Sequence, residues 1–206
     1  MENKRRTQAE RSAATSAALK AAARRLWAER GFAEVGTPEI ATAAGVTRGA
    51  MYHQFADKNA LFVAVLDDIE REVMARLVDA VERAAPDSPA TALRVAADEW
   101  LEVCLDPEVH RLVLLDAPSV LGWSRFRDLT RQYSLGLTEA LLGEAIDAGQ
   151  LAPQPTRPLA HILIGALDEG ALVIATATDR DRASGEVHDV LHRLVDALVG
   201  PPRSQG

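Results

Sequence analysis

A short stretch of donor-rich and small side chains carries the most distinctive chemistry in this sequence. Residues 47–54 read TRGAMYHQ, with one arginine beside a glycine and an alanine. An arginine guanidinium can donate a pair of hydrogen bonds to N7 and O6 of guanine, and small side chains let a backbone approach a DNA groove. Arg48 is therefore the best candidate for reading a base, with Gly49 and Ala50 beside it. Gln54 is a second polar candidate.

These side chains need a helix to present them, and the flanking residues predict two short helices. Thr37 can cap a first helix whose first position is Pro38. Gly45 supplies the residue at which that helix ends, because glycine adopts the left-handed conformation without a Cβ penalty. Thr47 can then cap a second helix. Two short helices joined by a tight turn are typical of a DNA-binding helix-turn-helix.

Charge is unevenly distributed along the 206 residues. Residues 1–58 hold 10 Lys and Arg against 6 Asp and Glu, a net charge of +4, whereas residues 59–206 hold 13 against 24, a net charge of −11. A small basic module on an acidic body is what a DNA-binding domain would show, although a solvated basic face gives the same count.

Composition also bears on the cellular compartment. The single cysteine, Cys104, excludes an internal disulfide framework and fits a reducing cytosol. The N-terminus lacks the apolar core of a signal peptide. The longest apolar runs, residues 162–167 and 171–177, are separated by Asp168 and Glu169 and fall short of the ~20 residues of a membrane span. We expect a cytoplasmic protein with no membrane partner.

Several short segments near the N-terminus resemble the TetR family of transcriptional repressors in order and spacing. The most specific part is the run from Tyr52 through Phe55 to Lys58, and the resemblance covers about the first 65 residues. The matching segments are residues 26–32 (LWAERGF), residues 40–41 (IA) with residues 44–46 (AGV), residues 51–55 (MYHQF), Asp57 with Lys58, and Leu61 with Phe62.

The resemblance implies roles for eight residues on double-stranded DNA. With Gly49 and Ala50 so short, specificity would lean on few base contacts and on DNA shape. The implied phosphate contacts are Thr37, Thr47, Tyr52, His53 and Lys58, and the implied base contacts are Arg48, Gly49 and Ala50.

The rest of the sequence alternates apolar helical stripes with turn segments, which predicts an all-α fold of about nine helices. We expect a three-helix DNA-binding domain over residues 1–57 and a larger helical ligand-binding and dimerisation domain over residues 58–206. Residues 1–10 are expected to be disordered or ordered only on DNA. The helix linking the domains is predicted over residues 58–84, and the others over 11–30, 91–105, 108–116, 124–148, 159–178 and 186–199, with a turn at 117–119.

The last two predicted helices are the most apolar part of the chain. The helix over residues 159–178 is nearly all apolar, so it must be covered on more than one side, either within one subunit or by a second copy of the chain. The TetR resemblance implies that these helices form a homodimer. The predicted interface residues are Leu163, Leu167, Val187, Val190, Leu191, Leu194, Val195 and Leu198.

A ligand pocket is predicted where aromatic residues gather in the middle helices. Pockets are mostly apolar with a few polar groups, although aromatic residues can equally fill a core. Asp168 is the sharpest candidate, because a carboxylate within an apolar helix needs a partner, a ligand or water, and a salt bridge or a bond at the dimer seam would also satisfy it. The candidate residues for a small, mostly apolar effector are Trp100, Cys104, His110, Trp123, Phe126, Tyr133 and Asp168.

An enzyme is the alternative class of function. His188 and His192 have a zinc-binding spacing on one helix face, but the sequence supplies no third ligand. Cys104 has no histidine placed to activate it. We therefore expect no enzyme, metal or cofactor, but a repressor that binds a palindromic operator as a homodimer and is released by a small effector. An all-helical enzyme or small-molecule carrier is the alternative.

Overall fold

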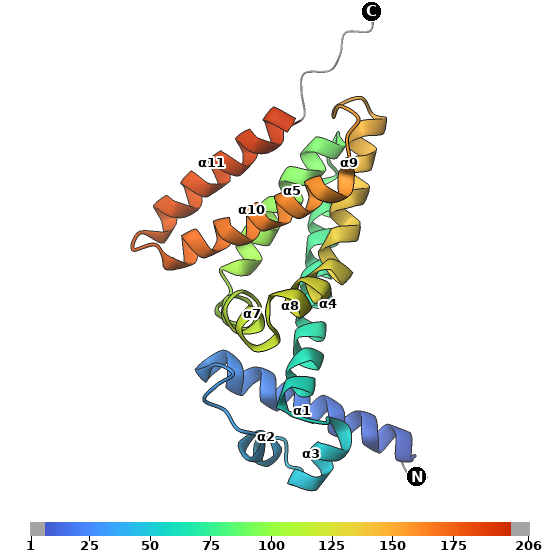
Figure 1. The fold of residues 1–206 in the computed structure, drawn as a ribbon, viewed down its shortest axis with the longest axis vertical. Helices are drawn as coiled ribbons and strands as arrows, with labels where there is room; N and C mark the ends of the chain where they lie inside the picture. Colours follow the sequence, from blue (N-terminus) through green and yellow to red (C-terminus); the bar gives the residue numbers. More distant parts are fainter. Residues whose placement is uncertain (1–6, 199–206) are drawn as a thin grey trace, which may run out of the picture.

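The protein is built entirely from helices in the part of the chain that its structure, a computed structural model, describes: residues 7–198 without the side chain of Arg131. Figure 1 shows a small lobe made of α1, α2 and α3 below a larger helical body, with the long α4 running from one to the other. These four helices are α1 (Gln8–Arg30), α2 (Thr37–Ala43), α3 (Arg48–Gln54) and α4 (Lys58–Ala84).

The body consists of two helical runs with internal π-helical turns and three regular helices. Counting each unbroken run once, the described residues form nine continuous helices, which confirms the predicted all-α fold. The elements of the body are α5 (Pro89–Cys104), α6 (Pro107–Val109), η1 (His110–Asp116), α7 (Ala117–Leu121), α8 (Trp123–Thr130), η2 (Arg131–Leu135), α9 (Gly136–Asp147), α10 (Thr156–Thr176) and α11 (Arg180–Leu198).

Helix α1 starts earlier than the sequence pattern predicted. The Thr7 side chain accepts a hydrogen bond from the Glu10 backbone N–H, and the Glu10 carboxylate accepts one from the Thr7 backbone N–H, so a capping box fixes the first turn. Residues 7–10 are therefore ordered, contrary to expectation, while the predicted basic arm before them lies outside the described residues. The buried face is centred on Leu19, Ala23 and Trp27.

The turn between α2 and α3 follows the prediction closely. Gly45 has φ of 67°, in the left-handed region, and the Thr47 hydroxyl accepts the Ala50 backbone N–H at 3.1 Å. One detail differs. Gly36 is the N-cap of α2, so Thr37 is already helical and its hydroxyl is free for another partner.

Aromatic packing joins the small lobe to α4. Phe62 of α4 meets Trp27 of α1 edge to face at 5.3 Å between ring centroids, and Phe32 lies 4.8 Å from Phe62. These rings belong to one continuous core that extends into the body as far as Ile174 and Leu191. The predicted division between residues 57 and 58 thus falls at a place where packing continues across it.

The helical run over α6, η1 and α7 corrects the predicted turn at residues 117–119. The backbone N–H of Ala117 donates to the carbonyl of Leu112, five residues back, so the helix widens just before Pro118. A proline clashes with the carbonyl four residues earlier in a regular α-helix, and a π-helical turn relieves that contact. The break comes instead at Gly122, whose φ is 75°.

Helices α10 and α11 pack as a close pair. Gly170 is buried, and a Cβ built on it would come within 2.9 Å of Cγ1 of Val187, so only glycine allows this approach. By length and composition α10 could cross a membrane, which differs from our expectation that no stretch was long and apolar enough. Its inner face packs against α5, α9 and α11, as the face of a core helix does.

Candidate functional site

The outer face of α3 presents the residues predicted to meet DNA. Arg48, Gly49, Tyr52 and His53 are all exposed. Beyond contact with the Thr47 hydroxyl at 3.9 Å, nothing lies near a Cβ built on Gly49, so the helix surface is open at that point. Arg48 and His53 therefore lie on the same exposed helix as Gly49, where no side chain in the described part of the chain covers the backbone.

Helices α2 and α3 are joined at this face by a small polar cluster. The hydroxyls of Thr37 and Tyr52 lie 3.2 Å apart, and the Arg48 guanidinium lies 5.7 Å from the centre of the Tyr52 ring. Hydrogen bonding to Thr37, and next to Arg48, lowers the pKa of Tyr52. The contact places the Arg48 guanidinium over the ring of Tyr52 on the exposed face of α3.

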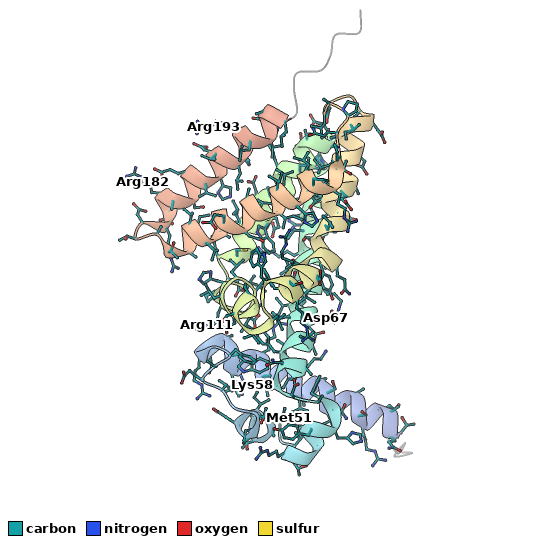
Figure 2. The ribbon with its side chains drawn as sticks, viewed as in Figure 1. Met51, Lys58, Asp67, Arg111, Arg182 and Arg193 are labelled. Carbon is teal, nitrogen blue, oxygen red and sulfur yellow. The ribbon has the colours of Figure 1, made fainter. Side chains whose placement is uncertain are left out.

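Gln54 and Lys58 are less available than the sequence suggested. Gln54 donates to the Ser12 hydroxyl at 2.8 Å and accepts from it at 3.2 Å, so it fastens α3 to α1 rather than pointing to bases. Lys58 donates to the Phe32 carbonyl at 2.6 Å and lies 4.1 Å from the centre of the Phe32 ring. Figure 2 labels Lys58, the first residue of α4. Burial lowers the pKa of Lys58.

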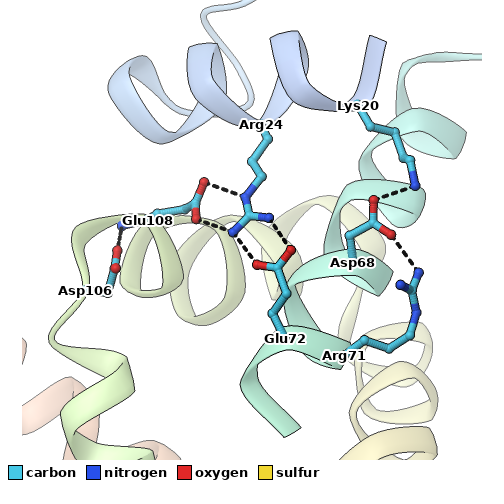
Figure 3. Close-up of polar contacts among 7 residues, drawn as sticks. All are labelled: Lys20, Arg24, Asp68, Arg71, Glu72, Asp106 and Glu108. Atoms are coloured by element: carbon cyan, nitrogen blue, oxygen red, sulfur yellow. Dashed lines mark hydrogen bonds and ion pairs between the residues drawn. The ribbon is translucent and has the colours of Figure 1, made fainter. Parts of the chain in front are cut away.

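A charged cluster fastens α1 to the body, as Figure 3 shows. Arg24 forms paired hydrogen bonds with Glu72 of α4, at 2.7 and 2.8 Å, and with Glu108 of α6, also at 2.7 and 2.8 Å. The bonds to Glu108 first, and then those to Glu72, raise the pKa of Arg24. Lys20 pairs with Asp68 at 2.5 Å. Bidentate arginine pairs fix geometry, so Arg24 holds α1 against both α4 and α6.

Asp116 makes a second connection between the two parts of the molecule. Its carboxylate accepts the Phe32 backbone N–H at 2.8 Å, while the Phe32 carbonyl accepts Lys58. Residue Phe32 thus lies between the end of η1 and the start of α4. Asp116 therefore holds the end of η1 against the small lobe.

An apolar cavity lies in the body between α4, α5, α9, α10 and α11, with residues from α8 and η2 completing its wall. Its polar groups are few: two carboxyls, three hydroxyls and one indole N–H. The lining residues are Glu70, Met74, Leu77, Leu93, Ala96, Ala97, Trp100, Thr130, Ser134, Leu137, Thr138, Leu141, Leu163, Ile164, Leu167, Asp168, Leu191, Leu194 and Val195.

The structure brings Trp100 and Asp168 into this cavity and leaves the other predicted pocket residues outside it. Trp123 is 65% exposed on the surface, and Phe126 is buried in the main core. Tyr133 donates a hydrogen bond to Asp67, outside the cavity. The remaining two predicted residues, Cys104 and His110, do not line it either. Aromatic side chains are core fillers first, and sequence spacing does not show which helix face meets which neighbour.

Glu70 is the functional candidate that the sequence prediction missed. It is 4% exposed, lines the cavity, and its burial first, then the charge of Asp168, raises its pKa to about 7. Burial also raises the pKa of Asp168 to about 7. A signal was present, because Glu70 falls on the apolar stripe of α4, four residues after Leu66 and three before Val73.

The two histidines considered as zinc ligands face an acid on α5. His192 Nε2 lies 2.7 Å from Oδ1 of Asp98, and His188 Nε2 lies 3.7 Å from the same oxygen. Across residues 7–198 no group of three or more His, Cys, Asp or Glu side chains is arranged to hold a metal ion. The pair therefore links α11 to α5.

The predicted dimer residues divide into two groups. Leu191 and Val195 are buried within the subunit, and with Leu163, Leu167 and Leu194 they line its cavity, while Val187 and Leu198 pack against its core. Val190 and Leu194 are 53% and 46% exposed. Most of the predicted interface residues thus pack within one subunit. The exposed large apolar side chains on α10 and α11 are Ile162, Val173, Val190 and Leu194.

Comparison with family models gives matches over both parts of the chain. Residues 19–65 match the model described as bacterial regulatory proteins, tetR family, and residues 90–198 match the model of the Tetracyclin repressor-like C-terminal domain. The first match covers the helix-turn-helix, and the second covers most of the cavity.

Individual relatives agree with these matches. The chain is 32% identical to a TetR-family transcriptional regulator from Pectobacterium atrosepticum, whose crystal structure superposes with a TM-score of 0.81. The match covers 96% of this chain and 100% of that regulator. The structure of RolR in complex with resorcinol has a TM-score of 0.70 at 18% identity, covering 95% of this chain and 100% of RolR. The Transposon Tn10 TetC protein of Escherichia coli is 27% identical over 122 residues, 58% of this chain and 59% of TetC.

Proposed function

The chain belongs to the TetR family of bacterial regulatory proteins, and on this premise we propose that it represses transcription by binding a palindromic operator as a homodimer and leaves DNA when a small effector binds. The observation that carries the proposal is the position of α4. Its first residue, Lys58, lies beside the DNA-reading lobe, and Glu70, Met74 and Leu77 of the same helix line the cavity.

The DNA-binding part of the proposal is supported by the exposed face of α3. Arg48 would make the base contact, and Gly49 and Ala50 would let the backbone approach the groove. Phosphate contacts fall to Thr37, Thr47, Tyr52, His53 and Lys58. Of these, Lys58 must first leave the Phe32 carbonyl, so we propose that it engages DNA only after a local change at the start of α4.

The effector part is supported by the cavity and its connections. A ligand that shifts α4 or α10 acts on α1 through Arg24, which holds both Glu72 and Glu108, and through Asp116 at Phe32. RolR, which shares the fold, was solved with resorcinol bound. We propose a small, mostly apolar effector for the present cavity.

The remaining proposals concern partner, chemistry and compartment. TetR-family proteins are regulators, and we propose no enzymatic activity, no metal and no cofactor for this chain. The second partner would be another copy of the chain, joined through the exposed faces of α10 and α11. A cytoplasmic location is expected for a protein that binds chromosomal DNA.

Salt-dependent DNA binding tests the proposal. The purified full chain is titrated with a palindromic fragment from upstream of its own gene and with random DNA, over a range of salt concentrations. Affinity should fall as salt rises, because phosphate contacts release counterions. Arg48→Ala should lose about 1 to 3 kcal/mol of discrimination between the fragments, whereas Lys58→Ala should weaken both to a similar extent.

Arg83→Ala is the matched control, because it removes the same charge from the far end of α4. It should bind both fragments as the wild type does. Absence of salt-dependent binding would remove the proposed function. Equal losses on both fragments for Arg48→Ala would reject its role as the base reader.

A further inference from the structure

Two carboxyl groups without partners lie in the cavity. Glu70 of α4 is 4% exposed, and Asp168 of α10 is partly buried. Among the described residues neither carboxyl forms a hydrogen bond or an ion pair, although each lines the same space. A buried carboxylate without a compensating group is strongly unfavourable. A ligand could supply the compensating group that the two carboxyls lack.

The electrostatics of the pair favour a single positive charge. The charge of Asp168 adds to burial in raising the pKa of Glu70 to about 7, and burial raises that of Asp168 to about 7. The pair therefore takes up protons near neutral pH, and as a coupled system it releases them in two steps whose pKa values belong to the pair rather than to either residue. Cys104 is the third titratable group that interacts electrostatically with Glu70 and Asp168. Burial raises the pKa of its thiol, so the thiol stays neutral.

The hydroxyls of the cavity wall point to the same kind of ligand. Thr130, Ser134 and Thr138 each donate to a backbone carbonyl three or four residues earlier in their own helical run. Their oxygens can therefore offer only lone pairs to a ligand. With the two carboxyls, nearly all polar atoms of the wall are acceptors, and an ammonium group has three donors and no acceptor.

Trp100 adds an aromatic side chain to the cavity wall. Its residue lines the cavity, and its indole Nε1 is buried with no hydrogen-bond partner in the described part of the chain. Buried donors are nearly always paired. The indole ring also offers an electron-rich surface that favours organic cations.

We propose that this cavity binds a monovalent organic cation: an ammonium group held between Glu70 and Asp168, on an apolar or aromatic body that fills the space among the helices. The inference rests on the proposed effector role of the cavity and narrows its ligand class. Met74, Leu93 and Leu163 would contact the body of the ligand. An anion would be repelled by the pair, and a neutral molecule would leave it uncompensated.

A matched panel of probes tests the proposal on the full chain. Phenethylamine, tryptamine and dodecylamine are compared with phenethyl alcohol, tryptophol and dodecanol by calorimetric titration at pH above and below 7. Above pH 7 at least one amine should bind about tenfold tighter than its alcohol. The advantage should shrink as the pH falls below 7, because the pair takes up protons, while the alcohols should show no such change.

Variants test whether the tighter binding of the amine depends on Glu70 and Asp168. Glu70→Gln and Asp168→Asn should each remove most of the difference between amine and alcohol, whereas Glu169→Gln, an exposed neighbour on α10, should keep it. Equal affinity for amine and alcohol in the wild type, or no binding of any amine, would overturn the proposal. So would a Glu70-dependent rise in melting temperature with Zn²⁺ or Mg²⁺ alone, which would reassign the site to a metal.

DNA binding separates this inference from the proposed function. If the chain binds its operator fragment but no amine, the regulator stands and the ligand class is wrong. If an amine binds through Glu70 and leaves DNA affinity unchanged, the site stands and its role as an effector site is wrong.

Discussion

Glu70 is a carboxylic acid at a position where the stripe of α4 otherwise carries apolar residues. Its neighbours on that stripe, Leu66 and Val73, are buried in the core. Retaining an acid there lowers stability whenever it ionises, because the charged form is desolvated and faces Asp168. The titration of Glu70 is therefore an informative measurement.

The pH dependence of unfolding should report on Glu70. Its pKa in the folded protein, about 7, lies above its ordinary value of 4.5, so its contribution to stability is complete below about pH 4.5 and is lost as the pH rises through about 7. In Glu70→Gln, urea denaturation across this range should show a shallower fall in the free energy of unfolding. Above pH 7 the variant should be the more stable protein.

The control for this measurement is Glu82→Gln, an exposed position on the same helix. It should follow the wild type across the whole range. Asp168 titrates in the same window and remains in both variants, so some slope should persist in Glu70→Gln. Identical slopes for Glu70→Gln and the wild type would show that Glu70 does not hold its proton in the folded state.

The turn between α2 and α3 determines the geometry of the DNA-reading element. Val46 donates its backbone N–H to Ala41 and Gly45 donates to Thr42, so the chain reverses within a few residues. The left-handed conformation of Gly45 makes this possible. The two glycines of this element, Gly45 and Gly49, should therefore respond in opposite directions to substitution by alanine.

Alanine substitutions should separate the two glycines. Gly45→Ala should lose about 1 to 2 kcal/mol of stability, since its Cβ meets no neighbour but must adopt φ of 67°. Gly49→Ala should gain about 0.5 to 1 kcal/mol, since Gly49 is inside a helix with open space around it. Thermal denaturation of both variants measures the difference. Equal effects of the two substitutions would contradict the assigned conformations.

Helices α10 and α11 leave an apolar surface uncovered at the scale of the whole molecule. Ile162 is 68% exposed and Val190 is 53% exposed. Exposed apolar side chains on adjacent helices mark an interaction surface, and a second copy of the chain would place two α3 helices to read one palindrome. Figure 1 shows this helix pair on the outside of the body, away from the DNA-reading lobe.

A charge placed on this surface should break the proposed dimer. Val190→Glu should be monomeric by size-exclusion chromatography with light scattering, because it buries an unpaired carboxylate in the interface. Its affinity for the operator fragment should fall, because a monomer carries only one helix-turn-helix. Val78→Glu introduces the same change on α4, at a side chain that is 40% exposed, and should remain dimeric. A dimeric Val190→Glu would place the interface elsewhere.

The sequence by itself determined the helices and the tight turn of the reading element. Caps, glycines and apolar periodicity are local signals, so Gly45, Thr47 and the long helix capped by Asp57 could be predicted from neighbours in the chain. The resemblance to the TetR family lay in that same local segment.

Only the tertiary structure decided which side chains share a site. Glu70 and Asp168 lie almost a hundred positions apart, and their meeting depends on how α4 and α10 pack. The gathering of aromatic residues in the middle helices did not show which helix faces meet, so Trp123 and Tyr133 lie outside the cavity that it predicted. Side-chain direction around a helix, and hence the make-up of the cavity, follows from long-range packing that no local pattern encodes.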